Sequence, residues 1–319
     1  MTSNIHRILV VGAGTMGHGI AQSFAQEDYD VALVDVKQEM LDRALVLINS
    51  SLETLAKYKI IKRSQIKKAI ARIKFTTSLK DVGRYADVAI EAVPEDKEIK
   101  AQIFNLLDRI CPPQTIIASN TTALNIFDIE KTSRPDKVLI SHWYTPPQLI
   151  PLVDVVKGPQ TSEDSIQLMV ELLKKIGKTP LLLRKFVSGY LISRLQIATL
   201  REIFYLLDND IVTPQELDMA AKAGLALRMM VVGLVQRIDF GGLDLTVKNL
   251  DNPYVQSQIT PPDYKPKKIY ELVKKGHLGI KTGKGFYDYA GRSEEELCRE
   301  RDAKLIKMLK IYNELQRMK

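Results

Sequence analysis

The chain has 319 residues, of which 45% are hydrophobic and 26% are charged, and its formal net charge is +8 at pH 7. This length favours two domains over the alternative of one large domain, and the composition is that of a globular protein. Its two cysteines, Cys111 and Cys298, lie far apart in sequence, which excludes a disulfide framework or a zinc cluster and is typical of a reducing cytoplasm. Because no apolar run is as long as a membrane span and the first strand begins too early for a signal peptide, we expect a cytoplasmic protein without metal.

A strand and a glycine-rich turn open the chain. The apolar run 8–11 leads into Gly12, Gly14 and Gly17, and a helix-compatible stretch follows at 19–25. Gly12 permits the tight turn, Gly14 lets the backbone approach a pyrophosphate, and Gly17 lets the helix pack on the strand. The helix N-terminus offers N–H groups to the phosphates. We therefore predict a dinucleotide site whose turn residues are Gly12, Gly14, Thr15, Met16 and Gly17.

An acidic residue follows the turn at the distance that this motif requires. Asp35 ends the second apolar run, residues 31–34. Its carboxylate can accept from both ribose hydroxyls and repels a 2′-phosphate, so the pattern favours NAD over NADP. The alternative is a glycine-rich turn that binds no ligand.

Much of the positive charge lies at residues 57–74, where isoleucines alternate with eight basic residues. This pattern predicts an amphipathic segment with a basic face, within a helical stretch from about 38 to 73. The basic face is either simply solvated or attracts an anionic substrate tail such as a nucleotide phosphate. No helix-turn-helix, zinc-finger or aromatic RNA-binding pattern accompanies the charge, so we expect no nucleic-acid partner.

Strands and helices then alternate up to about residue 185. We expect strands at 86–93, 115–118, 138–141, 152–156 and 179–183, and helices at 97–110 and 162–176. This alternation predicts a Rossmann-type α/β domain with a parallel, doubly wound sheet over residues 1–185. Helical periodicity takes over at 189–207, 214–223 and 293–319, so residues 186–319 are predicted to form a mostly α-helical C-terminal domain.

Alcohol oxidation with a dinucleotide needs a base for the hydroxyl proton, and histidine is the natural group. Of the four histidines, His142 ends the apolar run 138–141 and should lie at the carboxyl edge of the sheet, where open α/β folds bind ligands. Asp154, twelve residues later, is the only acid at 150–156. A buried acid needs a partner, and His142 is the simplest one. A structural histidine at a strand edge and a capping aspartate are the alternatives.

A third polar element is the segment 118–122, which follows a predicted strand and includes Ser119 and Asn120. One of its short side chains could hold a substrate hydroxyl or carbonyl. The alternative is an ordinary polar turn between a strand and a helix.

These motifs together resemble the L-3-hydroxyacyl-CoA dehydrogenase family along nearly the whole chain. The segments that carry the resemblance are 11–21, 89–95, 118–121, 141–144, 151–156 and 281–289. The resemblance implies that His142 is the base, Asp154 its acid partner and Ser119 the substrate-orienting serine. It also implies substrate contacts from Asn120 and Ser193, cofactor contacts from Glu95 and Lys100, and a homodimer formed through the helical domain.

Three positions depart from the family pattern. Asp154 stands where the family usually has Glu, Thr145 where it has Asn before proline, and Ser193 where it has the Asn of an Asn-Arg-Leu motif. Ser193 is smaller and can still donate one hydrogen bond, directly or through water. We expect altered substrate choice or reduced activity on the usual substrate.

The substrate class stays open between two options. Residues 146–153 and 224–228 resemble the sub-branch that includes L-gulonate 3-dehydrogenase (lambda-crystallin) and carnitine dehydrogenase. There Arg228 could clamp the carboxylate of a free hydroxy acid, although a structural arginine is the alternative. We favour an L-3-hydroxyacyl-CoA such as 3-hydroxybutyryl-CoA, with the basic residues at 57–74 attracting its phosphates. A third hypothesis, from another class, is a weakly active or inert NAD-binding structural or regulatory protein.

Overall fold

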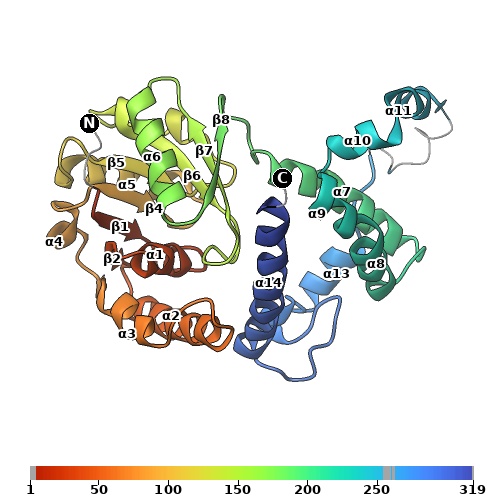
Figure 1. The fold of residues 1–319 in the computed structure, drawn as a ribbon, viewed down its shortest axis with the longest axis horizontal. Coiled ribbons are helices and arrows are strands. Elements are labelled where there is room, and N and C mark those ends of the chain that lie inside the picture. Colours follow the sequence, from red (N-terminus) through yellow and green to blue (C-terminus); the bar gives the residue numbers. More distant parts are fainter. Residues whose placement is uncertain (1–4, 254–259, 261–262, 318–319) are drawn as a thin grey trace. The chain divides into compact units, whose positions relative to one another are not determined.

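The computed structural model describes residues 5–253, 260 and 263–317. The chain divides into two compact units, Met1–Leu191 and Ile192–Lys319. The first unit carries the sheet and the second is helical (Figure 1). We predicted from the sequence that alternating strands and helices give way to helices alone near residue 185.

One eight-stranded sheet, in the order β3-β2-β1-β4-β5-β6-β7-β8, forms the centre of the first unit. The first six strands in this order are those of a doubly wound dinucleotide-binding fold. The strands are β1 (Arg7–Val11), β2 (Asp30–Val34), β3 (Ile73–Thr76), β4 (Val88–Glu91), β5 (Ile116–Ser119), β6 (Val138–Trp143), β7 (Leu152–Lys157) and β8 (Thr179–Leu183).

The predicted parallel sheet is confirmed for six strands but not for the last two. β1 to β6 are parallel, but β7 pairs antiparallel with β6, and β8 runs parallel to β7. A parallel crossover needs a dozen or more residues, usually with a helix. The connection at 144–151 is shorter than that and contains no helix, so the chain reverses direction.

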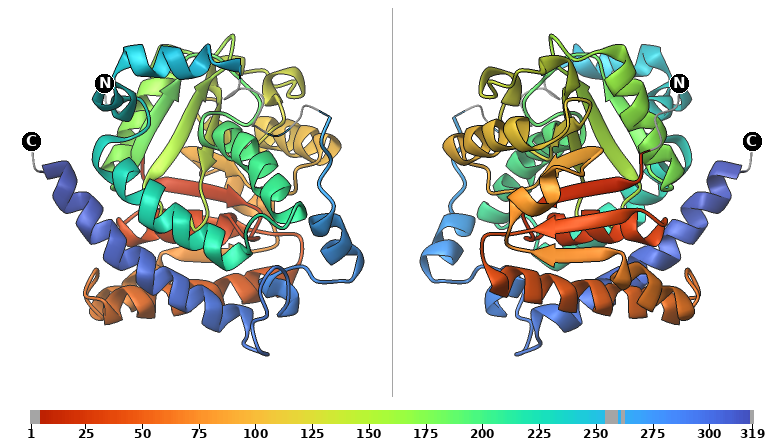
Figure 2. Two further views of the ribbon diagram at one scale, coloured as in Figure 1. Left: turned by 90° about the vertical axis from the view of Figure 1, so that its right-hand side faces the viewer. Right: turned by 90° about the vertical axis from the view of Figure 1, so that its left-hand side faces the viewer.

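Helices cover both faces of this sheet (Figure 2). All residues of β4, β5 and β6 are buried, which requires cover on both sides. The helices are α1 (Gly17–Gln26), α2 (Gln38–Lys57), α3 (Ser64–Ala71), α4 (Leu79–Gly83), α5 (Lys97–Ile110) and α6 (Glu163–Lys175), with single turns η1 (Ile126–Asp128) and η2 (Pro135–Lys137).

The predicted helical stretch 38–73 is not continuous. α2 ends at Lys57, Lys59 has a positive φ of 56° that interrupts the helix, and α3 follows. Ile73 belongs to β3, where it pairs with Val31 of β2. The amphipathic pattern is present in α3, which buries Ile66 and Ala69 and leaves its lysines exposed.

The second unit is helical, as predicted. Its described elements are α7 (Ile192–Asp208), α8 (Pro214–Ala220), the π-helical turn η3 (Ala221–Ala226), α9 (Leu227–Val232), α10 (Gln236–Gly241), α11 (Leu243–Leu250), α13 (Lys268–Lys274), η4 (Ile280–Thr282) and α14 (Glu294–Arg317). Thr213 and Glu216 form a capping box before α8, with Pro214 in the first turn. Within the described residues, no helix is both long enough and apolar enough to span a membrane.

Candidate active site

The three glycines of the first turn have different surroundings. Gly12 has a φ of +104°, and a Cβ there would lie 2.5 Å from the carbonyl oxygen of Ala92. A Cβ on Gly17 would lie 1.7 Å from the carbonyl oxygen of Gly12. A Cβ on Gly14 would meet no heavy atom within 4 Å. The fold itself therefore requires glycine at 12 and 17, whereas Gly14 borders open space, as expected where a pyrophosphate approaches the backbone.

Asp35 lies beside this turn, just after β2. Its Oδ2 accepts from the N–H of Ala13 at 2.8 Å, and its Oδ1 accepts from the N–H of Lys37 at 3.1 Å. Thr15 is exposed and Met16 is half-buried at the start of α1. The carboxylate is thus fixed at the carboxyl edge of the sheet next to the turn, so the residues fit a dinucleotide with a free 2′-hydroxyl.

His142 and Asp154 are brought together by the reversed strand. They lie directly opposite each other in the β6–β7 register, and Nδ1 of His142 lies 3.3 Å from Oδ2 of Asp154. Asp154 is fully buried, and His142 is 5% exposed. The ring of His142 lies against Tyr144 and Tyr190, with centroid distances of 4.7 and 4.8 Å. The pair leaves Nε2 of His142 as the ring nitrogen for a proton transfer; the catalytic roles stay predictions.

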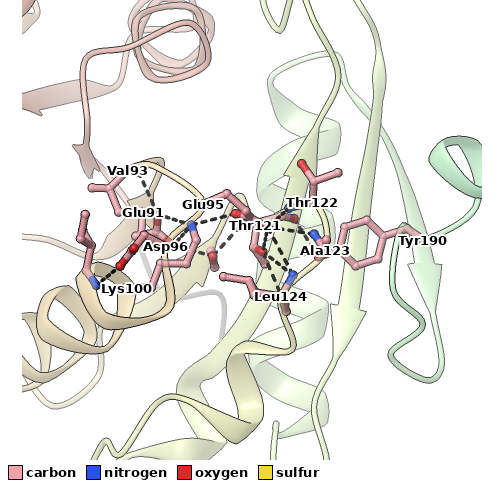
Figure 3. A network of polar contacts seen from close by, with 12 residues as sticks. Glu91, Val93, Glu95, Asp96, Lys100, Thr121, Thr122, Ala123, Leu124 and Tyr190 are labelled. Atoms are coloured by element: carbon pink, nitrogen blue, oxygen red, sulfur yellow. Dashed lines mark hydrogen bonds and ion pairs between the residues drawn. The ribbon is translucent and has the colours of Figure 1, made fainter. Parts of the chain in front are cut away.

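A second buried acid, Glu91, organises the neighbouring strand ends (Figure 3). Glu91 at the end of β4 is fully buried, and Lys100 of α5 is 1% exposed. Nζ of Lys100 lies 2.7 Å from Oε1 of Glu91 and 3.3 Å from Oε2 of Glu95. The sequence interpretation gave Glu91 no role, although an acid inside an apolar strand is the same signal that singled out Asp154.

This network also holds Ser119. The Ser119 hydroxyl donates to Oε2 of Glu91 at 2.5 Å and accepts from the N–H of Thr121 at 3.1 Å. Ser119 is fully buried. Its predicted role in orienting a substrate oxygen therefore requires the hydroxyl to turn away from Glu91. Lys100 likewise binds two carboxylates within the protein, and its predicted cofactor contact stays a prediction.

Glu95 anchors the turn after β5. Its Oε1 accepts from the hydroxyl of Thr121 at 2.6 Å and from the N–H groups of Ala123 and Leu124. Burial opposes ionisation, but the hydrogen bonds and the charge of Lys100 outweigh it, so the pKa of the Glu95 carboxyl lies below its ordinary value. Glu95 is thus an anion that orders the turn, and its predicted contact with the cofactor is untested.

Two further side chains connect this turn to His142. Oδ1 of Asn120 accepts from the N–H of Trp143 at 2.8 Å, which joins the end of β5 to β6. The hydroxyl of Tyr190 donates to the carbonyl of Thr121 at 2.7 Å, and burial raises the pKa of Tyr190. Asn120 is thus hydrogen-bonded to Trp143, the residue that follows His142. Tyr144 and Tyr190 are further site residues, to which the sequence interpretation gave no role.

The other two predicted substrate residues lie in the second unit. Ser193 is half-buried in the first turn of α7. Arg228 is exposed in α9, and its Nε donates to the carbonyl of Gly224 at 2.7 Å. Their contacts with substrate stay predictions. Among the residues that the structure describes, no group of three or more His, Cys, Asp or Glu side chains could hold a metal ion.

The buried Glu91–Lys100 pair predicts a large loss of stability on substitution. Glu91→Gln leaves the ammonium of Lys100 buried without its nearest counter-charge, so the free energy of unfolding should fall by about 3 kcal/mol or more in a denaturant titration. The double substitution Glu91→Gln, Lys100→Met should recover part of this loss. Lys97→Met, at an exposed lysine of the same helix, is the matched control and should change it by less than about 0.5 kcal/mol. An unchanged midpoint for Glu91→Gln would contradict the pairing.

A glycine turn with an acid just after the next strand, together with a histidine–carboxylate pair on the same sheet, is the arrangement of an NAD-dependent dehydrogenase. The family model described as 3-hydroxyacyl-CoA dehydrogenase, NAD binding domain, matches residues 7–186, and the C-terminal domain of the same family matches residues 189–289. The chain therefore belongs to the 3-hydroxyacyl-CoA dehydrogenase family. It is an NAD-dependent oxidoreductase of that type, which confirms the predicted family, fold class and cofactor.

Individual relatives differ in the substrates that their names state. A probable 3-hydroxybutyryl-CoA dehydrogenase of Bacillus subtilis is 34% identical over 287 residues, which cover 89% of this chain and 98% of the relative. A 5-formyl-3-hydroxy-2-methylpyridine 4-carboxylate 5-dehydrogenase of Mesorhizobium japonicum is 28% identical, covering 96% of this chain and 98% of the relative.

Solved structures show the same two kinds of relative. A crystal structure of the pyridine carboxylate dehydrogenase, described as an NAD+-dependent dismutase, has a TM-score of 0.87 at 28% identity and covers 97% of this chain and 99% of its own. A (S)-3-hydroxybutyryl-CoA dehydrogenase of Ralstonia eutropha has a TM-score of 0.69 at 31% identity and covers 90% of this chain and 100% of its own.

Proposed function

We propose that this protein oxidises an L-3-hydroxyacyl-CoA, such as 3-hydroxybutyryl-CoA, to the 3-ketoacyl-CoA with NAD. The observation that carries the proposal is the His142–Asp154 pair at the sheet edge, with Nδ1 of the histidine on the carboxylate. This arrangement holds the tautomer in which Nε2 accepts a proton. The names of the 3-hydroxybutyryl-CoA relatives support the CoA ester as substrate.

Each residue of the site has a separate task in this proposal. Nε2 of His142 takes the proton of the substrate 3-hydroxyl, and Asp154 stabilises the resulting imidazolium. Asn120 and Ser119 orient the substrate oxygen, the latter after its hydroxyl leaves Glu91. The glycine turn and Asp35 hold NAD, which supplies the hydride acceptor.

Cations on the surface of the first unit support a CoA ester. Lys67 and Lys68 lie on the exposed side of α3, and further basic residues of the segment 57–74 flank them. Such a positive surface attracts the phosphates of a nucleotide tail.

A second candidate is oxidation of a substrate with a free carboxylate. It is favoured by the long match to the pyridine carboxylate dehydrogenase, which covers 97% of this chain. It is also favoured by the exposed guanidinium of Arg228, a planar group suited to a carboxylate. L-gulonate and carnitine are the other substrates of this type that the sequence favours.

Steady-state NADH formation with a substrate panel tests the proposal. The panel contains L-3-hydroxybutyryl-CoA, L-gulonate, carnitine and the formyl-pyridine carboxylate. We expect the highest kcat/KM with the CoA ester. A higher value with any carboxylate would replace the proposal by the second candidate. No turnover with any of the four, in a protein that binds NADH, would favour an inert NAD-binding protein.

We also propose a homodimer formed through the second unit. Large apolar side chains are exposed there on four helices, and an exposed apolar patch is typical of a protein–protein interface. They are Leu195, Ile197 and Leu200 of α7, Leu227, Met229 and Val231 of α9, Ile238 and Phe240 of α10, and Leu243, Leu245, Val247 and Leu250 of α11. Sedimentation equilibrium should give twice the chain mass, and a monomer across the concentration range would contradict this.

A further inference from the structure

The carboxylate of Asp154 has a second donor besides the histidine. The hydroxyl of Tyr144 donates to Oδ2 of Asp154 at 2.6 Å, and Nδ1 of His142 reaches the same oxygen at 3.3 Å. Oδ1 of Asp154 is buried and has no hydrogen-bond partner among the described residues. Two donors therefore share one oxygen, and the tyrosine makes the shorter contact.

The position of Tyr144 is fixed from both sides. It follows β6 directly and lies two residues after His142, so both side chains point to the same face of the chain, and their rings meet edge to face at 4.7 Å. Lys178 holds the connection that carries Tyr144. Its Nζ donates to the carbonyls of Pro147 and Ile150 at 2.6 and 3.1 Å. The phenol thus lies against the imidazole ring, with its hydroxyl on the carboxylate of Asp154.

An aspartate needs such a partner more than a glutamate would. Asp154 is one methylene shorter than the acid usual in the family, and its oxygen lies at the long end of hydrogen-bond distance from Nδ1. A phenol that donates to that oxygen holds the carboxylate in place. The hydrogen bond from the phenol also stabilises the negative charge on Oδ2, the oxygen of Asp154 that faces the imidazole. Less of that charge is then available to the imidazolium.

We infer that Tyr144 is a positioning residue that sets the strength of the His142 base through Asp154. By sharing Oδ2 of Asp154 with Nδ1 of His142, Tyr144 limits how far the carboxylate stabilises the imidazolium. The inference rests on the proposed function for its catalytic meaning, but the effect on His142 exists in the protein without substrate.

The side chains that contact the ring of His142 are the other groups that can change its interactions. Among the described residues these are Asp154 on β7, Tyr144 on the β6–β7 connection and Tyr190 after β8. The Tyr190 hydroxyl donates to the carbonyl of Thr121 and not to Asp154. Tyr190→Phe is therefore the matched control, since it removes a hydroxyl near the same ring without changing the donors on the carboxylate.

The first test is an NMR titration of the histidine rings in the full-length protein without substrate, with His142 assigned from the spectrum of His142→Gln. In Tyr144→Phe the carboxylate keeps only the imidazole as donor, so the His142 midpoint should rise relative to that of the unmodified protein. Tyr190→Phe should leave it in place. An unchanged or lower midpoint in folded Tyr144→Phe would overturn the inference, whether or not the enzyme turns over.

The second test is a double-substitution cycle that combines Tyr144→Phe with Asp154→Glu. Asp154→Glu should lower kcat/KM in the presence of Tyr144, because the longer acid crowds the phenol. In the Tyr144→Phe background it should cost several-fold less, and the acid limb of the pH profile should follow the NMR midpoint. Additive effects of the two substitutions would contradict the inference. A shifted midpoint in a protein without turnover would instead reject the proposed function and leave the role of Tyr144 standing.

Discussion

Replacing His142 with glutamine should lower kcat by roughly 10²- to 10⁴-fold, the range that loss of a general base produces. Glutamine retains a side-chain donor that can meet Asp154, so the buried carboxylate keeps a partner and the fold should survive. The turn at Gly14 and the carboxylate of Asp35 are unchanged, so the Kd for NADH should stay the same. Steady-state NADH formation and a fluorescence titration with NADH measure the two quantities.

His6→Gln is the control for this experiment. His6 is exposed just before β1, and its replacement should leave kcat within twofold, as expected for a surface change without effect on chemistry. If His142→Gln kept the turnover of the unmodified enzyme, another group would have to accept the proton, and the assignment of the base would be wrong.

Gly14→Ala and Gly17→Ala should separate cofactor binding from folding. A methyl group on Gly14 meets nothing in the protein within 4 Å, so the melting temperature should not change. It would occupy the space where the backbone approaches the pyrophosphate, and overpacking of about 1–3 kcal/mol predicts a Kd for NADH that is roughly 5- to 150-fold higher.

Gly17→Ala should behave differently, because its methyl group would lie 1.7 Å from the carbonyl oxygen of Gly12. The turn must shift, so the melting temperature should fall and NADH binding should be lost with it. Thermal unfolding and NADH titration of both variants check this. Unchanged NADH affinity in Gly14→Ala would mean that the turn has only a structural role.

Local patterns in the sequence were sufficient for the glycine turn, for most strand and helix positions and for the likeness to the family. α5 lies within its predicted approximate bounds, because a proline pair follows its end and apolar residues recur at helical spacing. β3 was missed because Lys74 and the preceding basic residues made its residues look like the end of a charged helix. Its strand pairing depends on β2, which is remote in sequence.

The sequence predicted a contact within the site only where a buried polar residue had one obvious hydrogen-bond partner. Asp154 in an apolar run required a donor, and His142 is indeed beside it. The same argument applied to Glu91, but its partner Lys100 lies on the next helix, and an acid–lysine pair at that spacing has no distinctive pattern. The short connection before β7 was readable from the predicted strands 138–141 and 152–156, which have no predicted helix between them, but it was not used to set the direction of β7. The shared oxygen of Asp154 depends on Tyr144, which only the folded strand pair brings within reach.

We propose that this enzyme oxidises the 3-hydroxyl of an acyl-CoA with NAD, using the His142–Asp154 pair. A single-turnover experiment with L-3-hydroxybutyryl-CoA and NAD, in which NADH is measured by absorbance and the acyl product by mass spectrometry, tests it most directly. We predict equal amounts of NADH and 3-ketoacyl-CoA, formed in one fast phase by the unmodified enzyme and roughly 10²-fold more slowly or less by His142→Gln. Absence of the 3-keto product, or the same rate in both proteins, would contradict the claim.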